Sequence, residues 1–526
     1  LNQKSHLATS DLNNWFNTFD PSGFIQVGGN LSGTLNNLFW TDAILTYKKS
    51  SLKGQVRLKD IISESSIDLK IEDMRLTSLA DDLKDLMPKI LEPVLPESLK
   101  LLGKTTMSGI FQLSGDYIDF EGFIDSQLGS LNTKFEMGNL DLPDYAFYSG
   151  KFETKGLRLG QMLKVKDLGL VSGSLYLKGR GLSNDKLNTN LELNLKALEY
   201  LDYVYHDIDL RADLIAPFQK WSWSISDESL ITKGTLNIDD KLAQKQISLN
   251  SEVTFVNLNA LGLVSRDRVS EFSGGVVAEF YGSDYSNLSG KMSFSDAFYQ
   301  TKERYYYFEQ FDIDLINDSN QKYLSISAPD VVEGQLSGNF IWGQLTDLFT
   351  NALGESYMNY QPISVQLNQS LQYDFTVYHK FVDIFFPELQ LGRKTQIKGT
   401  LSDRPEEFEM AFDAPELLLF GNYLGGVHIL VDNNNKLFRS ALSVDSIYTG
   451  SRYFNDFKWV NGNTTDTVQM SVTFKGGKKR QDDYQLNLFQ TKDTLQNVVF
   501  GINQSMLNLG DQKWTFNQSG KENSHR

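Results

Sequence analysis

One phrase recurs along this chain, a glycine followed by apolar residues at every second position. The clearest copy is Val171-Ser-Gly-Ser-Leu-Tyr-Leu-Lys-Gly179, inside residues 150–182. Apolar residues with a period of two are typical of a β-strand that has one apolar face and one solvated face. Further copies begin at Gly54, Gly109, Gly234, Gly290 and Gly399. The repetition predicts a protein built from one kind of strand, whose function resides in a surface.

The copies do not return at a constant interval. A β-helix or a propeller repeats coils or blades of constant length, so irregular spacing argues against both. It favours one antiparallel sheet whose hairpins differ in length. No Pro/Ser/Gly linker of ten or more residues interrupts the pattern, so we expect residues 1–526 to form one continuous repetitive segment. The candidate breaks are helical insertions near 76–98 and 343–358.

Few segments have helical spacing of their apolar residues. We expect an amphipathic helix over Ser10–Phe19, a stronger one over Leu76–Leu91 and a short one over Leu345–Leu353. Single helical turns are expected at Leu157–Val165 and Val256–Leu263. Clusters of Asn, Asp and Gly mark hairpin turns because these residues tolerate positive φ. The clearest such clusters are Asn317–Asn320, Asp432–Asn435 and Gly476–Arg480.

Composition agrees with a β-rich protein and excludes several classes. The chain has 526 residues with 34 Phe and 23 Tyr but only 11 Pro. Its net charge of −16 disfavours nucleic acid as a partner, because phosphates bind Lys and Arg. The absence of cysteine removes disulfides, cysteine nucleophiles and thiolate metal sites.

No run of about 18 apolar residues occurs, so no segment is expected to span a bilayer as a helix. The chain starts at Leu1 rather than Met, and we expect it to be part of a longer protein whose membrane anchor lies upstream.

Enzymatic chemistry has little support in the sequence. The five histidines lie far apart, and no nucleophile elbow, Walker loop or dinucleotide fingerprint is present. We therefore expect no catalytic residues, no cofactor and no metal site. Asp432–Asn435 lacks the ligand spacing of a calcium loop and is interpreted as a turn. Tyr305–Phe308 and Lys478–Arg480 are interpreted as strand and hairpin-tip residues rather than as sugar or headgroup sites.

The apolar face of a sheet of this size must be shielded from water by other groups. Two short helices cannot cover it, so the face must curl on itself, pair with a second sheet or meet an apolar ligand. Because strands twist, a flat open sheet is disfavoured. The expected fold is all-β, an elongated and curled antiparallel sheet that forms a groove, with a few short helices.

Several segments resemble a known family. Leu157-Arg-Leu-Gly-Gln-Met-Leu163, followed by Leu168-Gly-Leu-Val-Ser-Gly173, resembles the TamB proteins of Bacteroidota-type bacteria, which belong to the AsmA-like envelope proteins. Pro96-Glu-Ser-Leu-Lys-Leu-Leu-Gly103 and the tail Lys513-Trp514-Thr-Phe516 are similar to the same family. The near-motif covers about residues 95–182, and the chain departs from the family in lacking an N-terminal membrane helix and a complete C-terminal domain.

The resemblance implies a long β-groove with an apolar interior, located in the periplasm and anchored in the inner membrane by an N-terminal helix that is missing here. It implies phospholipids as partners, held by their acyl chains and passed between the two membranes. It also implies support of outer-membrane protein assembly through docking on an outer-membrane barrel of the TamA type.

Alternating apolar positions are the candidate groove lining, with passive solvation of acyl chains as their role. The candidates are Leu175, Leu177, Leu191, Leu193, Leu195, Ile247, Leu249, Val253, Phe255, Phe408, Met410, Phe412, Met470, Val472 and Phe474. The same pattern would also build the closed core of a β-sandwich. The alternative function is therefore a surface adhesin or glycan-binding protein made of stacked sandwich domains, and a third is a structural spacer of the periplasm.

Overall fold

The computed structural model places most of the chain. It describes residues 5–11, 23–34, 36–60, 68–79, 82, 101–139, 141–241, 244–283, 287–318, 321–354, 360–385, 389–392, 394–434, 439–450, 452–464, 467–477, 482–495, 497–509, 512–517 and 523–525. These residues form an antiparallel sheet of 33 strands with a few short helices, which confirms the predicted fold class. The helices are α2 (Leu159–Leu163), α3 (Leu345–Gly354) and α4 (His379–Phe385).

The chain divides into two compact units. Unit 1 comprises Leu1–Val277 and Ala297–Tyr305, and unit 2 comprises Ala278–Asp296 and Tyr306–Arg526. The division passes through β16 (Ser270–Gly282), β17 (Ser289–Thr301) and β18 (Tyr305–Asn317). The insertions near 76–98 and 343–358 therefore lie inside unit 1 and unit 2, respectively.

In unit 1, each strand from β1 to β15 pairs antiparallel with the next one along the chain. The strands are β1 (Ser5–Ala8), β2 (Phe24–Thr34), β3 (Asn37–Tyr47), β4 (Ser50–Lys59), β5 (Asp68–Leu79), β6 (Lys104–Ser114), β7 (Tyr117–Ser126), β8 (Gly129–Gly138), β9 (Phe147–Arg158), β10 (Leu168–Arg180), β11 (Asn188–Tyr200), β12 (Tyr203–Ile215), β13 (Phe218–Asp227), β14 (Leu230–Lys241) and β15 (Gln244–Asn257). Short 3₁₀ turns, η1 (Thr9–Asp11) and η4 (Pro143–Tyr145), lie between strands.

Unit 2 is also antiparallel, but its strands do not all pair in sequence order, since β21 pairs with β23, β22 with β24, and β29 with both β30 and β31. Its strands after β18 are β19 (Lys322–Ala328), β20 (Val332–Asn339), β21 (Ser370–Val377), β22 (Leu389–Leu391), β23 (Thr395–Ser402), β24 (Glu409–Leu419), β25 (Asn422–Asp432), β26 (Ser440–Thr449), β27 (Arg452–Thr464), β28 (Thr467–Gly476), β29 (Asp482–Lys492), β30 (Val498–Ile502), β31 (Ser505–Leu509), β32 (Gln512–Phe516) and β33 (Asn523–His525). The 3₁₀ turns η5 (Trp342–Gln344) and η6 (Pro405–Glu407) flank α3 and β24.

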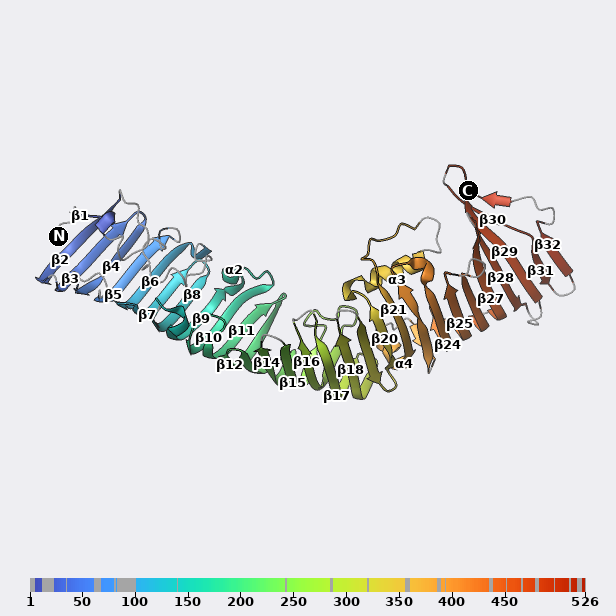
Figure 1. Ribbon diagram of the computed structural model, residues 1–526, viewed down its shortest axis with the longest axis horizontal. Helices are drawn as coiled ribbons and strands as arrows, with labels where there is room; N and C mark the ends of the chain where they lie inside the picture. Colours follow the sequence, from blue (N-terminus) through green and yellow to red (C-terminus); the bar gives the residue numbers. More distant parts are fainter. Residues whose placement is uncertain are drawn as a thin grey trace. The chain divides into compact units, whose positions relative to one another are not determined.

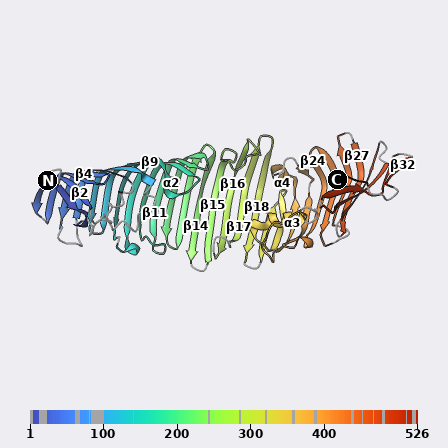
Figure 2. The same ribbon diagram turned by 90° about the horizontal axis from the view of Figure 1, so that it is seen from above.

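Figures 1 and 2 show each unit as one layer of strands, seen from two directions. Buried apolar side chains form separate clusters within each unit. In unit 1 they include Ile118 and Phe120 of β7, which are 0 % and 1 % exposed and pack with residues of β3 to β8. In unit 2 one cluster joins β19 to β27 with α4, and another forms under α3.

The glycines of the repeated phrase occupy special backbone positions. Gly173 has φ of +154°, and a Cβ there would lie 2.2 Å from the carbonyl oxygen of Asn194. Beside Gly173, the register of β10 shifts relative to both neighbouring strands, β9 and β11. Only glycine tolerates this close approach, so the glycine marks a kink in the strand rather than simply its beginning.

Several helix predictions need correction or lie outside the described residues. Leu345–Leu353 is a helix that ends one residue later, and Leu157–Val165 contains α2, so both predictions are confirmed. The helical turn predicted at Val256–Leu263 is wrong, because strand β15 continues to Asn257 and hydrogen-bonded turns follow it.

For Leu76–Leu91, the first four residues close β5, Asp82 is helical and the other residues lie outside the described part of the chain. From residue 12 onward, the helix expected at Ser10–Phe19 also lies outside the described part of the chain.

Candidate functional site

One face of unit 1 carries large apolar side chains from strand to strand. Residues directly opposite each other in an antiparallel pair share a face. Leu177 pairs with Leu191, which pairs with Ala212. The row continues through Trp221 and Leu236 to Leu249 on β15. We call the side of each unit's sheet that carries these rows its apolar face.

The structure brings most of the predicted lining of unit 1 together on this face. Pairings connect the following residues: Leu175, Leu177, Leu191, Leu193, Leu195, Ile247, Leu249 and Val253. All are half-buried except Leu195, which is buried.

Phe255 is the exception among the predicted residues of unit 1. It pairs with Ile231, whereas Val253 pairs with Thr232, the next residue of β14. A register shift at this point inserts one extra residue into β15, so Phe255 turns to the opposite face. Val256, which is 7 % exposed and pairs with Leu230, takes its place on the apolar face.

The apolar face of unit 2 holds five of the six residues predicted there. Met410 and Phe412 pair with Val431 and Ile429, and these rows continue to Met470 and Val472. Phe474 pairs with Tyr484, and the two rings stack 4.5 Å apart. All five predicted residues are half-buried.

Phe408 belongs to a closed core instead. It follows η6 outside the strands, is 0 % exposed, and meets Phe349 of α3 edge-to-face at 5.6 Å. Because α3 covers it, Phe408 is not accessible to a ligand in this arrangement.

Helix α3 covers one end of the apolar face in unit 2, where Figure 1 shows it on one side of the strands around β21. Its Leu348 and Ala352, both 0 % exposed, pack in one cluster with Phe340, Leu371 and Leu401. Polar contacts tie this helix down. Asn351 Oδ1 accepts hydrogen bonds from the Tyr360 hydroxyl and from the Ile363 amide, and Asn433 Nδ2 donates to the Ala352 carbonyl.

The opposite face of each sheet carries charged pairs together with exposed apolar side chains such as Ile110 and Leu430. Lys134 pairs with Glu121 at 2.7 Å and Lys233 with Glu252 at 2.7 Å across neighbouring strands. The hydrogen bond to Glu121 and the attraction of its charge raise the pKa of Lys134. In unit 2 this face has a hollow of about 650 Å³ bordered by Asp374, Lys398, Glu409 and Asp432. The alternation of the strands therefore places these ion pairs on the face opposite to the apolar rows.

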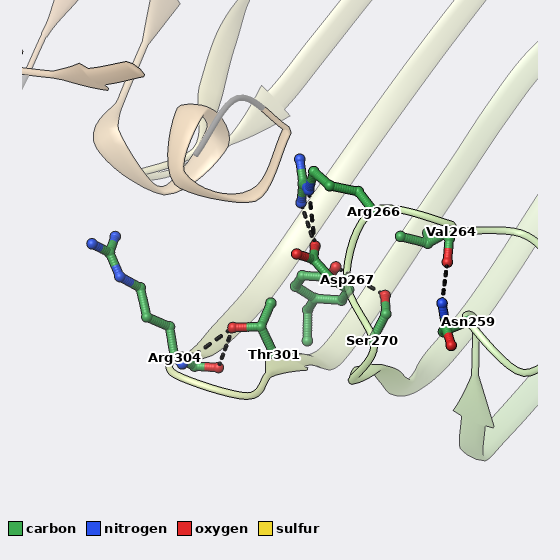
Figure 3. A network of polar contacts seen from close by, with 8 residues as sticks. Asn259, Val264, Arg266, Asp267, Ser270, Thr301 and Arg304 are labelled. Atoms are coloured by element: carbon green, nitrogen blue, oxygen red, sulfur yellow. Dashed lines mark hydrogen bonds and ion pairs between the residues drawn. The ribbon is translucent and has the colours of Figure 1, made fainter. Parts of the chain in front are cut away.

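A longer loop and a short turn lie at the ends of strands in unit 1. Figure 3 shows the loop between β15 and β16 beside the turn after β17. Asn259 Nδ2 donates to the Val264 carbonyl at 2.9 Å, and the Arg266 guanidinium donates to the Asp267 carboxylate. Thr301 exchanges hydrogen bonds with the backbone of Arg304, whose guanidinium points away from the network.

Sequence reasoning missed many residues of the apolar face. Trp221, Trp223 and Ile225 alternate with serine, so the same period-two pattern indicates them. Ile397 and Ile429 also lie on the face in unit 2. Glycine or a pair of apolar residues interrupts the alternation in the strands of Ile397 and Ile429, which obscures the period-two pattern.

Other kinds of site have no support in the described residues. These residues contain no group of three or more His, Asp or Glu side chains placed to hold a metal ion. None of the helices in the same part of the chain has the length and apolar character needed to cross a bilayer. Comparisons of the chain with protein-family models, curated proteins and solved structures find no match.

Proposed function

We propose that this protein binds phospholipid acyl chains along the apolar faces of its two units and serves as a hydrophobic conduit between membranes. The observation that supports this proposal is the apolar face of unit 1. Rows of Leu, Ile and Trp side chains cross consecutive strands of a single layer, and the predicted lining residues on this face, apart from the buried Leu195, are half-buried rather than sealed.

Physical chemistry makes such a face a suitable solvent for lipid tails. Each CH₂ group removed from water contributes about 0.8 kcal/mol. Ten strands, β6 to β15, at about 4.8 Å spacing give a face roughly 45 Å wide. An acyl chain spans about half of a hydrocarbon core that is roughly 30 Å thick. Several chains therefore fit side by side, and no activated group is needed.

The cellular setting of this proposal comes from the TamB resemblance. The protein would work in the periplasm, reach the inner membrane through a segment outside this chain, and dock on a barrel of the TamA type in the outer membrane. Its role in outer-membrane assembly belongs to the same proposal. The adhesin alternative requires two facing sheets per domain, whereas each unit has one layer of strands in the described residues.

A charge placed on the apolar face tests the proposal. Leu249→Asp puts a carboxylate on this face of β15, and Asn250→Asp puts the same charge on the exposed polar face of the same strand. Binding of a fluorescent phospholipid to the purified chain should fall about tenfold for Leu249→Asp, because a charge in an apolar site costs free energy. It should not change for Asn250→Asp.

Unfolding measurements on the same two variants complete the test. Leu249 is half-buried, so its substitution should lower the free energy of unfolding by no more than about 1 kcal/mol. A loss of several kcal/mol together with no lipid binding by the unmodified chain would mean that the face is a closed core, and the proposal would fail.

A further inference from the structure

The hollow of about 650 Å³ in unit 2 has a floor made of two neighbouring rows of side chains. Both rows cross the five strands β20, β21, β23, β24 and β25, and residues that pair directly across strands share a face. One row is Ser337, Gln372, Thr400, Glu409 and Asp432, and the other is Gln335, Asp374, Lys398, Ala411 and Leu430.

The remaining lining residues show on which side of the sheet the hollow lies. Between the two rows runs a third one, in which Tyr373, Met410 and Val431 pack in the cluster under α3. Because successive residues of a strand point to opposite faces, the side chains of the two floor rows point away from this cluster. The hollow and α3 therefore lie on opposite sides of the sheet.

Several polar groups of the floor have no partner within the described residues. In this part of the chain, four of its side chains make no hydrogen bond or ion pair, namely Asp374, Lys398, Thr400 and Glu409. Lys398 does not bind Asp374 there although the two lie opposite each other in the register. Donors and acceptors along the floor are thus available to a ligand.

The mixture of these groups suits a neutral ligand with many hydroxyl groups. Gln335, Gln372 and Thr400 supply uncharged donors and acceptors, while three carboxylates supply further acceptors and Lys398 a charged donor. The excess of carboxylates repels anionic ligands, and the ammonium group among them disfavours a polycation. A sugar hydroxyl donates and accepts at once, so it can use both kinds of group.

An aromatic ring and an exposed apolar side chain lie at the two ends of the floor. Tyr323 of β19 pairs with Ser337, and its hydroxyl donates to Gln335 Oε1 at 3.1 Å. The ring therefore adjoins the hollow on the same face. At the other end, Leu430 is 58 % exposed. The C–H faces of sugar rings can pack on such side chains while their hydroxyl groups reach the polar floor.

We propose that this hollow binds a neutral linear oligosaccharide that lies across the five strands. Strands at about 4.8 Å spacing make the floor roughly 19 Å long, which gives room for several sugar rings. This site goes beyond the proposed function, because it occupies the opposite face of the sheet and needs no lipid.

Calorimetric titration of the purified chain with chitohexaose, cellohexaose and maltohexaose tests the site. The test variant combines Asp374→Ala and Glu409→Ala, which removes two carboxylates of the floor. The control variant combines Glu309→Ala and Asp445→Ala, which removes the same two residue types from unit 2 outside the hollow. All four side chains are exposed and make no ion pair in the described residues, so both variants should keep the thermal stability of the unmodified chain.

We expect the unmodified chain to bind at least one of the three oligosaccharides with a saturable signal. The test variant should bind that sugar at least about tenfold more weakly, because two charge-assisted hydrogen bonds to sugar hydroxyls are lost. The control variant should bind it as the unmodified chain does. Binding of a fluorescent phospholipid should be the same in all three proteins, because the apolar faces are unchanged.

Three results would overturn the oligosaccharide site. The first is that the unmodified chain binds none of the three sugars. The second is that the test variant binds sugar no more weakly than the control variant, which would place the sugar elsewhere. The third is that an oligolysine peptide binds and the sugars do not, which would make the carboxylates a site for cations. The proposed function is separate from all three, because its readout is lipid binding.

Discussion

At the scale of single residues, glycine and aromatic side chains act together on the apolar faces. A Cβ on Gly234 would lie 2.3 Å from the ring of Trp223, its cross-strand partner. A Cβ on Gly399 would lie 2.7 Å from the hydroxyl of Tyr373, which is also a cross-strand partner. A ring that lies over a glycine covers backbone that would otherwise be solvated. This explains why glycines recur within strands that they would otherwise weaken.

Tyr373 offers a direct test of this packing. Its hydroxyl oxygen is buried and has no hydrogen-bond partner in the described residues. We expect Tyr373→Phe to raise the free energy of unfolding by about 1 kcal/mol at pH 7, because it removes an unsatisfied polar group. The control is Tyr378→Phe, which deletes a hydroxyl that donates to Glu333 at 2.8 Å and should be neutral or destabilising. Chemical denaturation of the three proteins checks this. Destabilisation by Tyr373→Phe would contradict the packing.

The same residue predicts a dependence on alkaline pH. Burial raises the pKa of Tyr373 to about 12, whereas an unfolded tyrosine ionises near pH 10. The stability from this difference is present below pH 10 and is lost as the pH rises through about 12, because the unfolded chain releases its proton first. Between these values the unmodified chain should lose more stability than Tyr373→Phe. Parallel loss in both proteins would show that the phenol is solvated.

At the scale of elements, alternation predicted the strands well but not their irregularities. The rows through Leu191 and Leu193 lie where period two places them. Phe255 continues the same alternation and still faces the other way, because a bulge adds one residue to β15. Such a shift depends on pairing with β14, which no local pattern reveals. Phe408 was misplaced for a related reason, since α3 reaches it from more than fifty positions away in the sequence.

We expect helix α3 to unfold independently of the strands that it covers on the apolar face of unit 2. Leu348→Ala should lower the local stability of the helix by about 2–5 kcal/mol, because Leu348 is fully buried. Leu353→Ala is the matched control, since Leu353 is 41 % exposed on the same helix. Hydrogen exchange should speed up across Leu345–Gly354 in the first variant only. Equal protection in both variants would mean that α3 is not held by this cluster.

At the scale of the whole molecule, the all-β class and the antiparallel sheet follow from the sequence, whereas the state of the apolar face does not. Leucines at every second position, as at Leu191 and Leu193, serve the core of a sandwich and the face of a single layer equally well. What separates the two is whether another layer faces the strands, which depends on long-range packing.

Lipid mass spectrometry on the natively purified chain tests the central claim most directly, namely that the apolar faces hold acyl chains. We predict several co-purifying phospholipid molecules per chain, because half-buried Leu, Ile and Trp rows in a single layer favour apolar ligands. A protein that is free of lipid and remains monodisperse without detergent would contradict the account, because its apolar faces would then be closed against each other.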